Sequence, residues 1–148
     1  MYESCLEKQQ QIIEIFSHLL TDEEKYHLII EWGREQKTLE AKYKTSDNLV
    51  SGCQSQVYLH TYWLADKLVF ETESDALISA GLASLLTKVY SNETPEVILK
   101  CPATYLDQIG ISTSLTPNRA NGLYSIHLRM KQDALKLLLE KEKQLKQI

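Results

Sequence analysis

The chain has 148 residues, of which 43% are hydrophobic and 24% are charged, and its formal net charge is −4. This length suffices for a single domain, 1–148, whose hydrophobic core is stable without disulfides or bound metals. The acidic balance argues against nucleic-acid binding, which usually requires a basic surface. The apolar runs are far shorter than a membrane span, and the first residues lack the basic and apolar regions of a signal peptide. We therefore expect a cytoplasmic protein that contacts neither nucleic acid nor membrane.

The first half of the chain predicts two helices and then strands. Residues 1–20 are expected to form an N-terminal helix, because their apolar side chains recur at helical spacing. Thr21 and Glu24 have the spacing of a capping box, which predicts a second helix that frays near Lys37. The polar segment 38–47 has no clear period and is interpreted as a connection, with a possible helical turn.

Three short strands are expected next, at 49–50, 56–64 and 68–72. In the second of them apolar and polar positions alternate, as in a half-buried strand. Residues 65–67 suit a tight turn. Sequential strands joined by short turns pair antiparallel, so this region predicts a small three-stranded antiparallel sheet.

The second half of the chain is expected to be helical. Ser74 suits the N-cap of a long helix, with Asp75 in its first turn and Gly81 allowing a close neighbour. Further helices are expected to start at Pro95 and near Pro102, and a last one near Thr116. Residues 141–148 are rich in Lys and Gln and are expected to form a frayed tail. The fold class is therefore α+β, with helices packed on a small sheet.

The three cysteines, Cys5, Cys53 and Cys101, are far apart, and their odd number argues against a disulfide framework. No CxxC, CxxH or HxxxH spacing indicates zinc or an iron–sulfur cluster, so we expect no resident metal or cofactor. Cys5 is expected in a frayed segment where its exposure is incidental. Cys101 is expected at a junction between two helices.

The segment Gly52-Cys53-Gln54-Ser55 is a compact polar break between two apolar strand ends. Glycine permits a positive φ or a close backbone approach, so the following cysteine would be presented at a loop tip. A presented cysteine is a candidate nucleophile or sulfur carrier. The alternative is an inert buried thiol, because free cysteine is among the most buried residue types.

Several motifs occur in an order that resembles the SufE/CsdE family of sulfur acceptors for cysteine desulfurases. They are Glu23-Glu24-Lys25-Tyr26 with Ile29-Ile30-Glu31 and Gly33, Asn48-x-Val50-x-Gly52-Cys53-Gln54-Ser55-Gln56-Val57, Ser74-Asp75-Ala76 with Gly81-Leu82, Thr94-Pro95, and Leu115-Thr116-Pro117-Asn118-Arg119 with Gly122-Leu123. The resemblance covers nearly the whole chain past the first helix. It implies a SufE/IscU-like fold, similar to that of the U-type cluster scaffolds.

The resemblance also implies a function. Cys53 would take sulfane sulfur from a SufS-like or CsdA-like cysteine desulfurase as a persulfide, stimulate that enzyme, and pass the sulfur on for iron–sulfur cluster assembly. Pyridoxal phosphate would be carried by the desulfurase, and a cluster scaffold is one possible downstream acceptor. Supporting or partner-docking roles are expected for five residues: Gly52, Gln54, Ser55, Asp75 and Arg119. Alternatively, Arg119 is a surface residue that pairs with a carboxylate or with the carbonyls at a helix end.

The chain departs from the family pattern at two places. It has Gln36-Lys37 where the family commonly has Leu-Pro, and Tyr58 where the family usually has Trp. A cluster-scaffold role would need further thiolate ligands near Cys53, and no motif places any there.

Two competing functions remain open at this point. The first is a cysteine hydrolase with Cys53 as nucleophile and His60 or His127 as base, although neither histidine has an obvious orienting carboxylate. The second is a structural binding domain in which Cys53 is inert. Activity on acyl substrates without a desulfurase would favour the first, and thiol-reactivity measurements would test the second.

Overall fold

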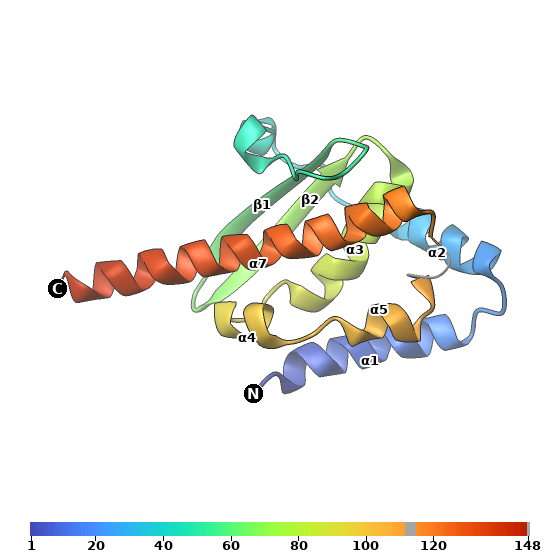
Figure 1. Ribbon diagram of the computed structural model, residues 1–148, viewed down its shortest axis with the longest axis horizontal. Coiled ribbons are helices and arrows are strands. Elements are labelled where there is room, and N and C mark those ends of the chain that lie inside the picture. The colour runs from blue at the N-terminus through green and yellow to red at the C-terminus, as the bar shows by residue number, and fades with distance from the viewer. Residues whose placement is uncertain (112–114, 148) are drawn as a thin grey trace.

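The computed structural model describes residues 1–111 and 115–147, so residues 112–114, in the loop expected after Gly110, and residue 148 of the expected tail lie outside the described residues. The structure is a mixed α and β fold that is mostly helical (Figure 1). The elements are, in order, α1 (Glu3–Ser17), α2 (Asp22–Glu35), the 3-10 turns η1 (Ala41–Tyr43) and η2 (Ser46–Asn48), β1 (Val57–Leu64), β2 (Lys67–Ser74), α3 (Leu77–Tyr90), α4 (Pro95–Lys100), α5 (Thr104–Gln108) and α7 (Pro117–Lys146). None of the helices within the described ranges is long and apolar enough to cross a membrane.

The sheet has two antiparallel strands, β1 and β2, so the expectation of three strands is wrong. Residues 49–50 reach β1 only through an isolated bridge between Leu49 and Tyr58. The reason is that the chain turns on both sides of this bridge: the Asn48 amide bonds to the Thr45 carbonyl in the 3-10 turn η2, and a turn at Ser51 and Gly52 then leads the chain away. A single bridge is too short to continue the ladder as a strand.

The alternation expected along β1 is confirmed. Val57 and Leu59 are buried against the core, and in β2 their face continues with the buried residues Leu68, Phe70 and Thr72. The opposite face carries His60, whose ring stacks on Tyr43 of η1 at 3.6 Å between ring centroids. The helices therefore pack on one face of the hairpin, and the other face is covered in part by the η1 segment.

Helices α2 and α3 pack against each other, and their backbones meet closely at Gly81. The sequence predicted a close neighbour at this position, because glycine has no side chain. A Cβ built on Gly81 would lie 2.0 Å from the backbone oxygen of Ile29 in α2. Thr21 caps α2 as predicted, because its side chain accepts from the Glu24 amide at 3.1 Å. Glu24, however, accepts from the Leu20 amide rather than from the Thr21 amide that a capping box would use. Figure 1 shows α2 next to α3, on the side away from the C-terminal end of α7.

The first helix is firmly docked, so the expectation of a frayed segment with an exposed Cys5 is wrong. One stripe of α1 is buried, formed by Cys5, Gln9, Ile12 and Phe16. Lys8 also ties α1 to the segment after α3, since its ammonium lies 2.6 Å from the buried Glu93 carboxylate and 2.9 Å from the Ser91 carbonyl. The helix ends at Ser17 rather than near residue 20, and Leu20 is exposed.

The start of α3 differs from the prediction. Ser74 pairs with Val57 as the last residue of β2, and Ala76 is the N-cap of a helix that begins at Leu77. Ser74 instead accepts a hydrogen bond from the Ala76 amide at 3.2 Å, within the bend. The strand ladder therefore displaces the helix start by two residues, and Asp75 lies before the helix rather than in its first turn.

The last helix, α7, spans the molecule and crosses the hairpin and α3 (Figure 1). Its inner face is buried as predicted at Leu123, Ile126, Met130 and Ala134. Helical backbone continues past Glu140 to Lys146, beyond the point where the tail was expected to fray, although the side chains of 141–147 are exposed as expected. Figure 1 shows this end of α7 projecting beyond the rest of the fold.

Candidate functional site

The cysteine loop, residues 51–56, is closed at its base by a hydrogen bond of 2.9 Å from the Val50 amide to the Val57 carbonyl. Gly52 has a φ of +89°, and a Cβ at this position would lie 2.4 Å from the Ser125 hydroxyl oxygen on α7. Glycine is therefore needed for two reasons, the left-handed backbone conformation and the close approach to α7. The next residue, Cys53, is thereby held against this helix.

The thiol of Cys53 is half-buried, and its sulfur lies 3.7 Å from the Gly122 carbonyl oxygen on α7, toward which the thiol donates. Burial raises the pKa of Cys53, because the thiolate loses hydration when it is partly removed from water. The resting site therefore holds the thiol form and keeps the concentration of the nucleophilic thiolate low.

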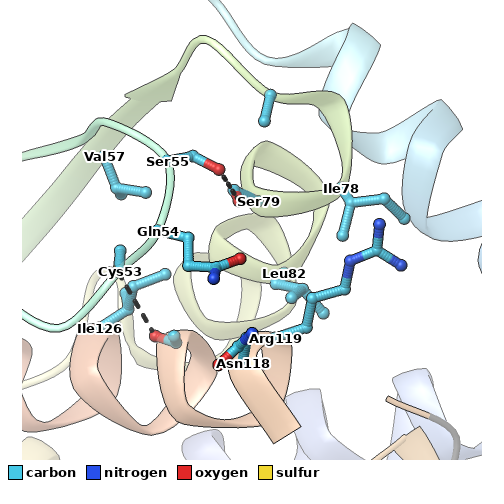
Figure 2. A pocket seen from close by; sticks show the side chains of 12 residues that line it. Cys53, Gln54, Ser55, Val57, Ile78, Ser79, Leu82, Asn118, Arg119 and Ile126 are labelled. Carbon is cyan, nitrogen blue, oxygen red and sulfur yellow. Dashed lines mark hydrogen bonds between the residues drawn. The ribbon is translucent and has the colours of Figure 1, made fainter. Parts of the chain in front are cut away.

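A cavity of about 150 Å³ lies beside this thiol. Figure 2 shows that its wall combines the cysteine loop, the first turns of α3 and the start of α7. Its apolar lining includes Val57, Leu82 and Ile126, and its polar lining includes Gln54, Ser79 and Asn118. The cavity is the size of a few atoms and opens beside the sulfur, so it suits a small group attached to Cys53.

The structure brings most of the predicted site residues to this cavity. Arg119 lines it together with Cys53, Gln54 and Ser55. In Figure 2 the Arg119 side chain extends toward Ile78, away from Cys53. The Ser55 hydroxyl lies 3.0 Å from the Ser79 hydroxyl on α3, which fixes the second half of the loop.

Gly52 and Asp75 are the predicted site residues that do not line the cavity, and Gly52 instead packs against Ser125 on α7. Asp75 is exposed in the bend between β2 and α3, directly before Ala76, which does line the cavity. Its position suits contact with a partner at the cavity mouth better than contact with the Cys53 sulfur.

Sequence reasoning missed three residues of the site: Ser79, Gly122 and Ser125. Ser79 follows the expected start of the long helix by less than two turns, but nothing in its local pattern indicates a bond to Ser55. Gly122 and Ser125 meet the loop only because α7 crosses it, with the Gly122 carbonyl at Cys53 and the Ser125 side chain at Gly52. Such contacts depend on the packing of distant segments.

The two histidines considered as catalytic bases lie elsewhere, and neither is among the described residues that line the cavity. The ring of His60 is stacked between Tyr43 and Tyr62 on the outer face of the hairpin. His127 is buried, tilted against Tyr90, and burial lowers its pKa to about 4. The arrangement therefore gives no support to a cysteine hydrolase.

The other two thiols are inaccessible, since Cys5 is 0% and Cys101 1% exposed. The side-chain amide of Gln9 lies 3.9 Å from the sulfur of Cys5 and 3.5 Å from that of Cys101. Burial, followed by the neighbouring Cys101, raises the pKa of Cys5 to about 12. Throughout the described residues no group of three or more His, Cys, Asp or Glu side chains could hold a metal ion.

The raised pKa of Cys53 predicts a characteristic pH profile of alkylation. Only the thiolate reacts, so the rate for Cys53 in the folded protein should still be rising above about pH 9.5, where an ordinary cysteine has levelled off. The measurement is the iodoacetamide rate at Cys53 against pH, read by peptide mass spectrometry. The same chain unfolded in urea is the control and should level off at the ordinary value. A folded-state plateau at or below that of the unfolded control would contradict the prediction.

Fold and site together define a small α+β protein that presents one accessible thiol on a glycine-containing loop beside a small cavity. The family profile described as "SufE: Fe-S metabolism associated domain" matches residues 10–134. The chain therefore belongs to the SufE family, whose members act in iron–sulfur metabolism.

Relatives agree with this assignment. The chain is 36% identical over 129 residues to an uncharacterized SufE-like protein of Rhizobium meliloti (strain 1021), covering 84% of this chain and 92% of that protein. It is 32% identical over 136 residues to "SufE-like protein 1, chloroplastic/mitochondrial" of Arabidopsis thaliana, covering 91% of this chain but 37% of the plant protein. The chain thus spans little more than a third of that longer relative.

A solved structure shows the same fold. It is the solution structure of a hypothetical protein from Thermus thermophilus, with a TM-score of 0.74 and 23% sequence identity. The similarity covers 89% of this chain and 96% of the other.

Proposed function

We propose that Cys53 accepts sulfane sulfur from a cysteine desulfurase and carries it as a persulfide. The observation that supports this proposal is the placement of the thiol. In a chain of the SufE family, Cys53 is the cysteine held on a loop at the surface, whereas Cys5 and Cys101 are buried in the core. A sulfur carrier needs a thiol that a partner enzyme can reach.

The transfer is a thiol exchange that conserves electrons. The Cys53 thiolate attacks the outer sulfur of a cysteine persulfide on the desulfurase, and a new sulfur–sulfur bond forms at Cys53. The bond between the two desulfurase sulfurs breaks, and the desulfurase cysteine leaves as a thiolate that takes up a proton. No external oxidant or reductant is consumed, because the sulfane sulfur is transferred at constant oxidation state.

The resting site shields the half-buried sulfur in part, and we expect the loop to move during transfer. Two contacts hold the tip of the loop, from Cys53 to Gly122 and from Ser55 to Ser79. Both are weak enough for a bound partner to replace them. Returning to the cavity would shield a Cys53 persulfide from oxidants and stray thiols, which attack exposed sulfur species.

Removal of the sulfur product stimulates the desulfurase, which is a SufS-like or CsdA-like enzyme carrying pyridoxal phosphate. Cys53 then passes the sulfur to a downstream acceptor such as an iron–sulfur cluster scaffold. The direct test is a desulfurase assay with free cysteine and a thiol reductant, with and without this protein. Faster sulfide release with the protein supports the proposal, and an unchanged rate with every desulfurase of both classes would refute it.

Arg119 is expected to assist the transfer from the mouth of the cavity. Its guanidinium would stabilise the Cys53 thiolate or the incoming persulfide once the loop has moved, so Arg119→Ala should slow sulfur acceptance about tenfold. The measurement is the single-turnover rate of sulfur transfer from a preloaded desulfurase. Arg34→Ala, which removes an exposed arginine paired with Glu31 on α2, is the matched control. An Arg119→Ala rate equal to that of the control would exclude this role.

A further inference from the structure

The segment that leads into the cysteine loop is fastened to α7 by one arginine. Arg129 donates from Nη1 to the Leu49 carbonyl at 2.9 Å and from its other terminal nitrogen to the Asp47 carbonyl. Its Nε lies 3.0 Å from the Asp133 carboxylate, one turn further along α7. Each of the three guanidinium nitrogens therefore has a partner, and two of these partners are backbone carbonyls just before the loop.

These contacts belong to a single stripe of α7. Gly122, Ser125, Arg129 and Asp133 follow each other at intervals of three or four residues, which places them on one face of a helix. The first two meet the loop at Cys53 and Gly52, and Arg129 meets the segment before it. Asp133 accepts from the Thr61 hydroxyl on β1 at 2.8 Å, so the stripe also holds the strand that follows the loop.

The contacts at the two ends of this stripe differ in strength. At the tip, the Cys53 thiol faces the Gly122 carbonyl across 3.7 Å, and a thiol is a weak donor. At the stem of the loop, residues 47–49, the Arg129 guanidinium donates to the Asp47 and Leu49 carbonyls. Hydrogen bonds that involve a charged group are about twice as strong as neutral ones. The side chains of Arg129 and Asp133 are 21% and 19% exposed, so water competes with these bonds only in part.

We propose that Arg129 is a positioning residue that sets how readily the Cys53 loop leaves its resting place on α7. With the stem fixed, only the short tip at 51–56 can swing out, and the thiol returns to the same cavity after each excursion. Without the guanidinium, residues 47–50 lose their bonds to α7 and keep the Val50–Val57 bond at the base of the loop, so the open state gains population. The inference rests on the proposed function, in which an opened loop delivers sulfur, but the opening itself can be measured on the protein alone.

The experiment compares the alkylation rates of all three cysteines in the 148-residue chain, using iodoacetamide and peptide mass spectrometry. Cys5 and Cys101 are 0% and 1% exposed and react only when the whole protein unfolds, so they report global opening within the same sample. In Arg129→Met, the Cys53 rate should rise about tenfold relative to the wild type, with the rates of Cys5 and Cys101 unchanged. Arg129→Lys keeps a charge but cannot span two carbonyls and a carboxylate, and should raise the Cys53 rate about threefold.

The matched control is Arg34→Met, which removes an arginine paired with an exposed glutamate on α2 and should leave all three rates unchanged. A Cys53 rate in Arg129→Met equal to that of the control would overturn the inference. An equal acceleration of all three cysteines would also overturn it, because it would mean that Arg129 stabilises the fold as a whole. If Arg129→Met does not fold, Arg129→Lys takes its place. The increase of its Cys53 rate over the wild type is then compared with the increases for Cys5 and Cys101. Since no desulfurase is present, the result stands separately from the outcome of the sulfur-transfer assay.

Discussion

Incubation with a cysteine desulfurase and free cysteine is expected to add mass to this protein in steps of about 32 Da, the mass of one sulfur atom, on Cys53. The physical reason is access, because Cys53 is the thiol that lies on a surface loop. Cys53→Ser should abolish both the mass gain and the stimulation of the desulfurase. The two effects should disappear together, because acceptance of the sulfur is what frees the desulfurase for another turnover. Intact-protein and peptide mass spectrometry measure the first effect, and sulfide release measures the second.

The control for this experiment follows from the burial of the other two cysteines. Serine in place of Cys5 or Cys101 would leave a hydroxyl in the core and lower stability, so alanine is the better replacement. The Cys5→Ala, Cys101→Ala double variant should gain sulfur and stimulate the desulfurase as the wild type does. Persulfide that maps to Cys101, or stimulation that persists without Cys53, would show that another residue carries the sulfur.

The largest effect on stability is expected from Gly81→Ala. The added methyl group would lie 2.0 Å from the Ile29 carbonyl oxygen and 2.5 Å from its Cγ2 atom, so α2 and α3 would have to move apart. Overpacking of this kind within a well-packed core should lower the free energy of unfolding by about 3 kcal/mol. Equilibrium denaturation in urea, monitored by far-UV circular dichroism, measures this loss.

Gly122→Ala is the matched control, since it makes the same change inside a helix. Its nearest contact would be the Cys53 sulfur at 3.9 Å, an ordinary van der Waals distance. Alanine is also the better helix former, so the free energy of unfolding should stay equal or rise by up to about 1 kcal/mol. Equal stabilities of Gly81→Ala and Gly122→Ala would show that α2 and α3 adjust to the methyl group at no cost.

Local signals in the sequence sufficed for the features that depend on neighbouring residues. The Thr21 cap was predicted from its spacing to Glu24, and the start of α4 at Pro95 from the preference of proline for the first position of a helix. The hairpin of β1 and β2 followed from period-two alternation, and the inner face of α7 from helical spacing. These features are set by contacts over one or two turns of chain, which a pattern along the sequence records directly.

The cysteine loop itself was also predictable, because glycine before Cys53 signals a special backbone conformation. The φ of Gly52, +89°, agrees with that expectation. The order of the motifs along the chain indicated the SufE family, and the family match over residues 10–134 confirms it.

Only the tertiary structure decided how distant segments meet. Cys5 is buried beside Cys101 because the apolar stripe of α1 docks on the core, where Lys8 also pairs with Glu93, 85 residues away in the chain. The expected third strand did not form, because the Asn48 amide, which a longer ladder would have used, bonds to the Thr45 carbonyl in η2 and the chain turns again at Ser51 and Gly52. The stripe of α7 that holds the Cys53 loop also could not be predicted from local sequence patterns. Its bonds join Gly122 to Cys53 and Arg129 to Leu49, which lie 69 and 80 residues apart. Such pairings depend on which helix crosses which loop, and the energy that selects them arises from burial of the whole core rather than from local spacing.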